Sequence, residues 1–279
     1  MKKFDIDFNI FELAEFKGDI KSLKEDIKKI QSLYNIEIDR YKLYEDTYAC
    51  ITKKEFASGG YSIHRGYYCP DLYETITTGG CSRGKLLKRL TKKSVVSYEY
   101  CYEGEYLSLI KCFDDPRHEY SRKGVQSIEF LEREGNIEIG VEFAVNRGDY
   151  DYYYKFPEYI TVTQYDKERI VNTRTFCSSI VEKRNNDVLF DSFDYQMIWY
   201  EYNDKNMLVS IRKASYDCGN GLELKKIVFE HDRTGCLDYY HFSDDIEEQK
   251  YKVSDENRNY YCIVLYETFQ GANGRRRWV

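Results

Sequence analysis

Apolar residues recur at two different periods along this chain, and the change of period divides it. From Leu13 to Tyr34 they recur at alternating steps of three and four, which places them on one stripe of a helix. We interpret the stripe as packing on the protein's own sheet; a coiled-coil seam is the alternative. Beyond residue 35 the period becomes two, which is typical of strands with one covered face.

The region after residue 95 repeats one unit: a strand, a polar turn and a returning strand. Asn136, Asn206 and Gly235 stand in three of the turns, and these residue types accept the positive φ of tight hairpins. The predicted fold is mainly β, an extended antiparallel meander of repeated hairpins with an N-terminal helix packed on it. The expected segments are 1–35 (helical), 36–94 (a β-rich lead-in, continuous with the hairpin sheet) and 95–279 (the hairpin sheet). The expected turns lie at 103–105, 133–136, 166–169, 203–206 and 232–235.

Three of these turns share a sequence feature. The stretches "YDKERIV", "YNDKNML" and "HDRTGCL" resemble the YD repeat of RHS-type proteins, in which Tyr-Asp is followed by a Gly turn and a Leu. The resemblance covers about residues 95–245. It implies a local hairpin architecture and a genomic neighbourhood of polymorphic toxins and their immunity proteins, but no encapsulating shell.

The charge balance narrows the class of partner. The chain of 279 residues has 42 Lys and Arg against 48 Asp and Glu, a formal net charge of −6. This acidity argues against a general nucleic-acid binder, with the basic stretch 83–93 as the one region that could contact RNA or a phosphate. The segment "GGCSRGKL" has the glycine and lysine spacing of a phosphate loop, but Leu86 replaces the required Ser or Thr, so we interpret it as a turn.

The cysteines and the hydropathy pattern predict a compartment. Nine cysteines, an odd number, are scattered through strand-like runs, which favours reduced thiols over disulfides. No stretch has the character of a signal peptide or of a membrane-spanning helix. We therefore expect a cytoplasmic protein with no membrane partner.

The stretch "FEHDRTGCLDYY" holds the most concentrated candidate chemistry. His231 and Asp232 fall at the turn of the last hairpin, where an aspartate caps its own backbone and needs no catalytic role. The alternative is a metal-dependent hydrolase or nuclease that uses His231, Asp232 and His241 with nearby acids such as Asp244. Since the histidines are few and no cysteine has ligand spacing, we expect no catalytic residues, no metal and no cofactor.

A tryptophan marks the candidate binding surface. The period-two columns place Trp199 on the sheet face opposite the helix, and an aromatic anchor among carboxylates is typical of a recognition patch. A Trp199 that is covered and belongs to the core is the alternative. The carboxylates expected beside it are Glu99, Glu129, Glu201 and Glu230.

These observations favour binding over catalysis. We expect a cytosolic protein-binding β-repeat protein, in its most concrete form an immunity-type inhibitor that blocks a toxin. The hydrolase above and a structural β-repeat protein are the alternatives. The pattern specifies neither the identity of the protein partner nor the oligomeric state.

Overall fold

A computed structural model describes several segments of the chain between residues 39 and 252. The described residues are 39–59, 62, 64, 85–113, 124–145, 157–167, 169–184, 187–217, 221–233, 237–244 and 248–252. They form the helix α2 (Arg40–Ala49) and the strands β1 (Lys53–Ser58), β2 (Lys85–Leu86), β3 (Tyr98–Glu103), β4 (Tyr106–Phe113), β5 (Val125–Glu134), β6 (Ile137–Ala144), β7 (Tyr159–Asp166), β8 (Arg169–Arg184), β9 (Asp187–Tyr202), β10 (Leu208–Asp217), β11 (Gly221–His231), β12 (Leu237–Asp244) and β13 (Glu248–Lys252).

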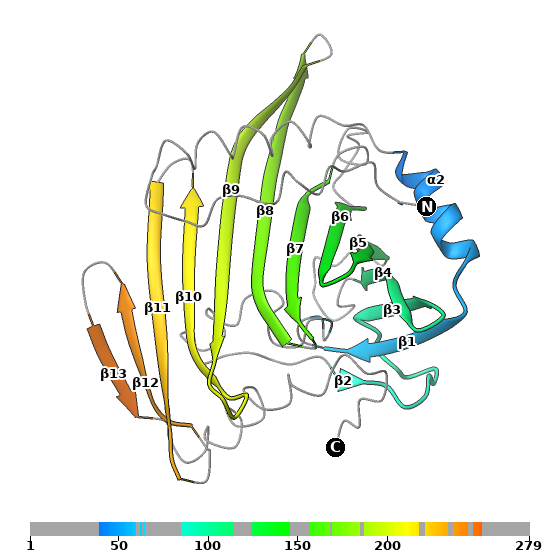
Figure 1. Ribbon diagram of the computed structural model, residues 1–279. Coiled ribbons are helices and arrows are strands. Elements are labelled where there is room, and N and C mark those ends of the chain that lie inside the picture. The colour runs from blue at the N-terminus through cyan, green and yellow to red at the C-terminus, as the bar shows by residue number, and fades with distance from the viewer. Residues whose placement is uncertain are drawn as a thin grey trace.

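All these strands belong to one antiparallel sheet. From β3 to β13 each strand pairs with the next along the chain, and β1 lies between β2 and β3. The sheet curves, so that β7–β11 are seen broadside in Figure 1 while β3–β6 are seen nearly end-on, with α2 beside them. The predicted fold, an antiparallel meander with an N-terminal helix, is confirmed.

The predicted hairpin turns are also confirmed. Strands end and restart at 103/106, 134/137, 166/169, 202/208 and 231/237. The left-handed backbone position is Gly104 in the first turn, Gly135 in the second, Lys167 in the third and Asn206 in the fourth, with φ between 60° and 63°. Asn206 takes the predicted role, whereas in the second turn Gly135 takes it in place of Asn136, because glycine meets no steric penalty there. Gly235 lies outside the described residues.

The helix α2 corrects one sequence-based expectation. Residues 40–49 alternate in a way that predicted a strand, yet they form a helix. Asp39 caps its first turn by accepting a hydrogen bond from the backbone N–H of Lys42, at 3.0 Å. Tyr44 and Tyr48, four residues apart, then pack on the sheet from one side of the helix. The predicted helical stripe from Leu13 to Tyr34 lies outside the described residues.

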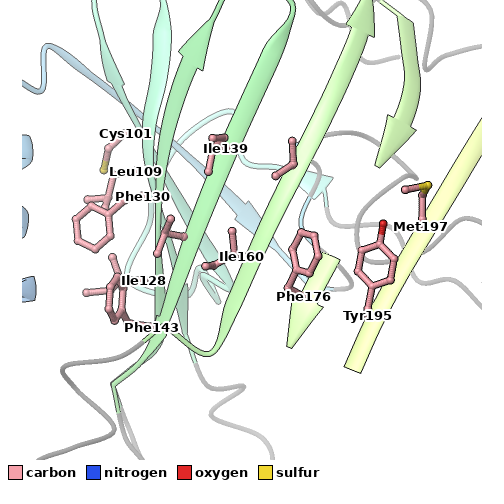
Figure 2. Packing of buried hydrophobic residues seen from close by; sticks show 12 residues of the cluster. Cys101, Leu109, Ile128, Phe130, Ile139, Phe143, Ile160, Phe176, Tyr195 and Met197 are labelled. Carbon is pink, nitrogen blue, oxygen red and sulfur yellow. The ribbon is translucent and has the colours of Figure 1, made fainter. Parts of the chain in front are cut away.

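One face of the sheet carries the main core, and we call it the helix face because α2 packs on it. A row of directly paired residues crosses seven strands on this face, and every member is buried. Figure 2 shows these side chains, among which the Phe176 and Tyr195 rings stack at 4.8 Å between centroids. The row consists of Cys101, Leu109, Phe130, Val141, Ile160, Phe176 and Tyr195.

The other face, which we call the reverse face, has its own apolar cluster of Ala57, Tyr100, Ile110 and Leu131. Tyr100 and Phe130 stand at the same distance before their turns, and the repeated unit would place them on one face, but the structure shows them on opposite faces. Tyr100 pairs with Ile110 on the reverse face, whereas Phe130 pairs with Leu109 on the helix face. The turns differ in length and β-bulges shift the register, so an equal distance from a turn does not fix the face.

Candidate functional site

The register assigns each residue of the predicted recognition patch to a face. The helix face carries four of them: Glu99, Trp199, Glu201 and Glu230. Glu99 is two residues from Cys101 of the buried row, and Trp199 and Glu201 are four and six residues from Tyr195 on β9. Arg212 pairs with both Trp199 and Lys226 of β11, and Glu230 is four residues beyond Lys226 on the same strand. Glu129 pairs with Ile110 and Glu142 on the reverse face. Trp199 therefore lies on the same face as α2. The helix predicted from Leu13 to Tyr34, from which Trp199 was expected to face away, lies outside the described residues.

Glu99 is separated from the rest of the patch because it is buried near α2. Its carboxylate pairs with the ammonium groups of Lys54 at 3.1 Å and Lys111 at 3.6 Å. The Lys111 ammonium lies over the rings of Tyr44 and Tyr48, both from α2. Burial by itself would raise the pKa of Glu99, but the hydrogen bond from Lys54 and the charge of Lys111 outweigh it and hold the pKa below its usual range. Glu99 therefore anchors the helix and is not an exposed acid.

Cys101 lies beside this ionic cluster and donates a thiol hydrogen bond to Glu99, at 3.3 Å. A thiol, a carboxylate and lysines together are the groups of a nucleophilic site. Their environment opposes that chemistry: Cys101 is fully buried, and burial followed by the charge of Glu99 raises the pKa of its thiol to about 12. Because the nucleophile is the thiolate, a thiol held protonated in this way is structural.

Trp199 lies at the border between the buried core and the charged side chains of the helix face. It is half-buried and packs on the main core cluster. Asn172 of β8 and Arg212 of β10 are its direct neighbours in register, and the Arg212 guanidinium lies over the indole ring, 5.3 Å from its centroid. Arg212 also pairs with Glu201 at 3.1 Å, and Glu201 accepts a hydrogen bond from Ser210. The ring is thus bordered by a salt-bridged guanidinium.

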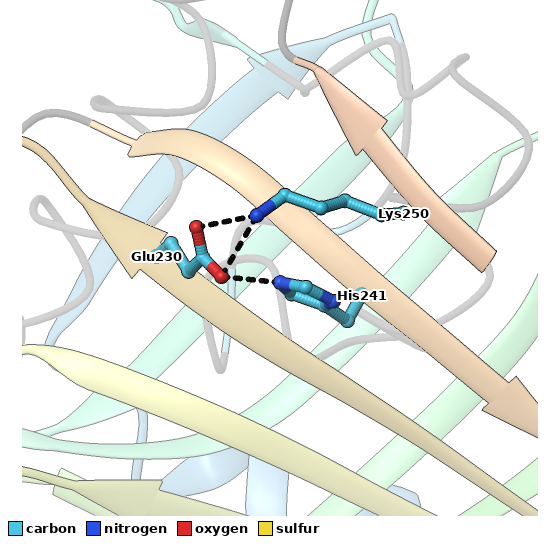
Figure 3. Close-up of polar contacts among 3 residues, drawn as sticks. All are labelled: Glu230, His241 and Lys250. Atoms are coloured by element: carbon cyan, nitrogen blue, oxygen red, sulfur yellow. Dashed lines mark hydrogen bonds and ion pairs between the residues drawn. The ribbon is translucent and has the colours of Figure 1, made fainter. Parts of the chain in front are cut away.

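A second charged group lies on the helix face across β11, β12 and β13. The carboxylate of Glu230 accepts two hydrogen bonds from Lys250, at 2.9 and 3.0 Å, and a further contact joins it to Nε2 of His241 (Figure 3). The bonds from Lys250, and then the bond with His241, lower the pKa of Glu230. Lys250 also lies over the ring of Tyr239, at 4.4 Å. Glu230 is therefore a partnered carboxylate within a mixed charged surface.

The alternative catalytic residues occupy separate positions. His231 is half-buried at the end of β11, and desolvation lowers its pKa against the opposing charge of Asp232. His241 stands opposite Val228 and is engaged with Glu230. Among the residues that the structure describes, no group of three or more His, Cys, Asp and Glu side chains is arranged to hold a metal. The side chain of Asp244 lies outside them.

Sequence reasoning missed the basic side chains around Trp199 and a buried pair on the reverse face. Arg174 and Lys226 lie on the helix face with Trp199, but on other strands. Alternation along one strand does not identify them, because the register between strands must also be known. On the reverse face His64 Nε2 lies 3.0 Å from a carboxylate oxygen of Glu138, and both residues are buried. No sequence signal connects these two residues, which are 74 positions apart.

The remaining expectations concern thiols, the basic stretch and membranes. The described cysteines Cys50, Cys101, Cys112 and Cys177 form no disulfide bonds. In the basic stretch, Lys85 belongs to β2, and residues 85–113 contain no helix, unlike a phosphate loop. No helix in the described part of the chain is long and apolar enough to span a membrane.

Comparison with known proteins assigns the chain to no family. No protein-family model matches its sequence, and a search of curated proteins found no match.

Proposed function

We propose that this protein acts by binding another protein through the helix face of β9–β13. We call this region the Trp199 surface and define it by its described side chains, which combine aromatic groups with partly exposed charges. They are Trp199, Glu201, Arg212, Lys226, Glu230, Tyr239, His241 and Lys250.

The observation that carries the proposal is the position of Trp199. Its ring is anchored on the core cluster on one side and bordered on the other by Arg212, half of whose side chain is exposed, at 51%. Tryptophan and arginine are the residue types that contribute most often to binding hot spots. A ring that the core already holds in place loses little conformational freedom when a partner covers it.

The proposal extends to an immunity-type inhibitor that blocks a toxin in the cytoplasm. The support for this finer form is the resemblance of the turns to YD repeats, together with a sheet whose partly exposed face offers a broad area for a partner. Such an inhibitor needs a recognition surface and no catalytic groups. Two observations are compatible with a protein that has no catalytic groups. Glu201 and Glu230 are engaged in ion pairs, and the thiol of Cys101 is held protonated.

The test is capture of a partner from the native cell, with identification by mass spectrometry. Arg212→Ala and Trp199→Ala are compared with Tyr106→Ala, which removes an aromatic side chain that is 72% exposed at the β3–β4 turn. We expect the first two variants to lose a protein that the wild type and Tyr106→Ala retain. Because Trp199 packs on the core, the melting temperature of its variant is measured alongside, and Arg212→Ala provides a variant without core loss.

Equal capture by all variants would overturn the proposed surface. For the finer form, the captured protein is expressed in a host cell with and without this chain. We expect growth arrest that wild type relieves and Arg212→Ala does not. A captured partner that causes no arrest would remove the immunity assignment and leave protein binding in place.

A further inference from the structure

The cations around Trp199 are not balanced by the described carboxylates of the same face. Glu201 is engaged by Arg212 and Ser210. Among the described residues, no carboxylate pairs with Arg174 of β8 or Lys226 of β11. Within this part of the chain, two cationic side chains therefore remain without a counter-charge on either side of the Trp199–Arg212 pair.

Arg174 is the more unusual of the two cations. It is half-buried on β8 between Val162 and Met197, and its Nε donates a hydrogen bond to Asn172 at 2.9 Å. Desolvation lowers its pKa, while the guanidinium stays charged at any physiological pH. A partly desolvated cation gains more from an incoming anion than a fully hydrated one.

The pairing of the strands places these cations and Trp199 close together. Asn172, Trp199, Arg212 and Lys226 follow one another directly across β8, β9, β10 and β11. With strands about 4.8 Å apart, this row extends over about 15 Å. Arg174 stands two residues along β8 from Asn172, a step of about 7 Å. An extended segment a few residues long could contact every cation of the group.

Among the described residues, the reverse face of the same strands lacks this imbalance. There Lys225 of β11 pairs with Glu223 at 2.9 Å, and Lys213 of β10 and Asp194 of β9 contribute one charge of each sign. For the described side chains of these strands, the excess of cations is thus specific to the face that carries Trp199, in a chain whose net charge is −6.

We infer that the Trp199 surface, together with Arg174 of the adjoining strand β8, binds a carboxylate-rich protein segment. The acids of this segment pair with Arg174, Arg212 and Lys226 while one of its apolar groups covers Trp199. A nucleic acid fits less well, because only two described cations of the group lack a counter-charge and Glu201 stands among them, whereas nucleic-acid binders neutralise many phosphates. This inference rests on the proposed protein-binding function and adds the chemistry of the partner.

The test uses a fluorescein-labelled octaglutamate peptide as the probe, with labelled octalysine and an eight-nucleotide oligo(dT) beside it. Anisotropy is measured with the full chain at low and at physiological salt. The key variant is Arg212→Glu/Lys226→Glu. Its matched control is Lys88→Glu/Lys92→Glu, which makes the same charge change at two exposed positions of the basic stretch.

We expect octaglutamate to bind the wild type and the control, and to bind the key variant at least about tenfold more weakly, with the affinity falling as salt rises. Equal loss in both double variants would locate the contact elsewhere and overturn the inference. Tighter binding of oligo(dT) than of octaglutamate would overturn it in favour of a nucleic-acid site. If octaglutamate fails to bind while a native partner is still captured in an Arg212-dependent way, the acidic chemistry is wrong and the protein-binding function stands.

Discussion

The helix face of this sheet has two regions built on the same alternation but with opposite environments. From β3 to β8 its central row is apolar and buried, from Cys101 to Phe176. On β9 this face carries Tyr195, the last member of the row, and, four residues farther along the strand, Trp199. Trp199 stands in register with the charged side chains of Arg212 on β10 and, through it, Lys226 on β11. Alternation decides which side of a strand a residue occupies, but the neighbouring strands and α2 decide whether that side is covered.

The ionic groups of the two regions differ in the same way. Near α2, Glu99 and Lys111 are both buried, so their pairing is required by the fold. On the Trp199 surface, Arg212 and Glu201 are about half exposed, and a pair of this kind contributes little to stability. Substitutions in the ionic cluster near α2 should therefore lower the stability of the fold. Substitutions of the ion pair on the Trp199 surface should instead weaken binding of a partner.

The largest expected effect is in the buried row. Phe130 is fully buried and packs edge to face on Phe143, with 5.9 Å between ring centroids. We expect Phe130→Ala to lower the free energy of unfolding by about 3–5 kcal/mol, measured by chemical denaturation. The control Tyr106→Ala, at an exposed turn, should change it by less than about 0.5 kcal/mol. Similar values for the two variants would remove the distinction between core and surface.

The next effect concerns the ionic cluster near α2. Glu99→Gln leaves Lys54 and Lys111 without their carboxylate, and we expect a loss of roughly 3 kcal/mol at neutral pH. Because the folded-state pKa of Glu99 lies below its unfolded value, its contribution is present above about pH 4.3 and is lost as the pH falls through the folded pKa. The difference between wild type and variant should therefore shrink in acid.

The control for this variant is Glu103→Gln, at an exposed position of the same strand. Denaturation curves recorded between about pH 7 and pH 3 provide the comparison. A difference between wild type and Glu99→Gln that does not change with pH would contradict the assignment of Glu99 as a charged anchor.

A smaller effect is expected on thiol reactivity. Cys101 is buried with its thiol protonated, whereas Cys50 is exposed just after α2. We expect iodoacetamide to modify Cys50 at least about 100-fold faster than Cys101 in the native protein, as followed by peptide mass spectrometry. In denaturant the two rates should converge. Fast modification of Cys101 under native conditions would show that the core beneath α2 opens readily.

Much of the fold could be predicted from the sequence because its signals are local. Turn residues such as Asn206 and period-two alternation located the hairpins and the antiparallel meander. The helix α2 was missed because its sequence also alternates, and the cap at Asp39 and the packing of Tyr48 decided the outcome.

The candidate surface was predicted only in part, because its composition depends on register. Trp199 and Glu201 share a face, as alternation within one strand requires. Glu99 and Glu129 were assigned across strands, where turn lengths and bulges change the phase: Glu99 is a buried anchor and Glu129 faces the other way. The basic neighbours of Trp199 come from other strands for the same reason, so the patch expected to be acidic carries an excess of cations.

The most direct test of recognition through the Trp199 surface is one double variant measured in two ways. Arg212→Ala/Lys226→Ala removes charge from this surface without touching the buried row. We predict that its free energy of unfolding changes by less than about 1 kcal/mol, while its affinity for the captured partner falls about tenfold or more. A loss of about 3 kcal/mol in stability with unchanged affinity would contradict this prediction, because it would make the surface part of the folded core and not a site of recognition.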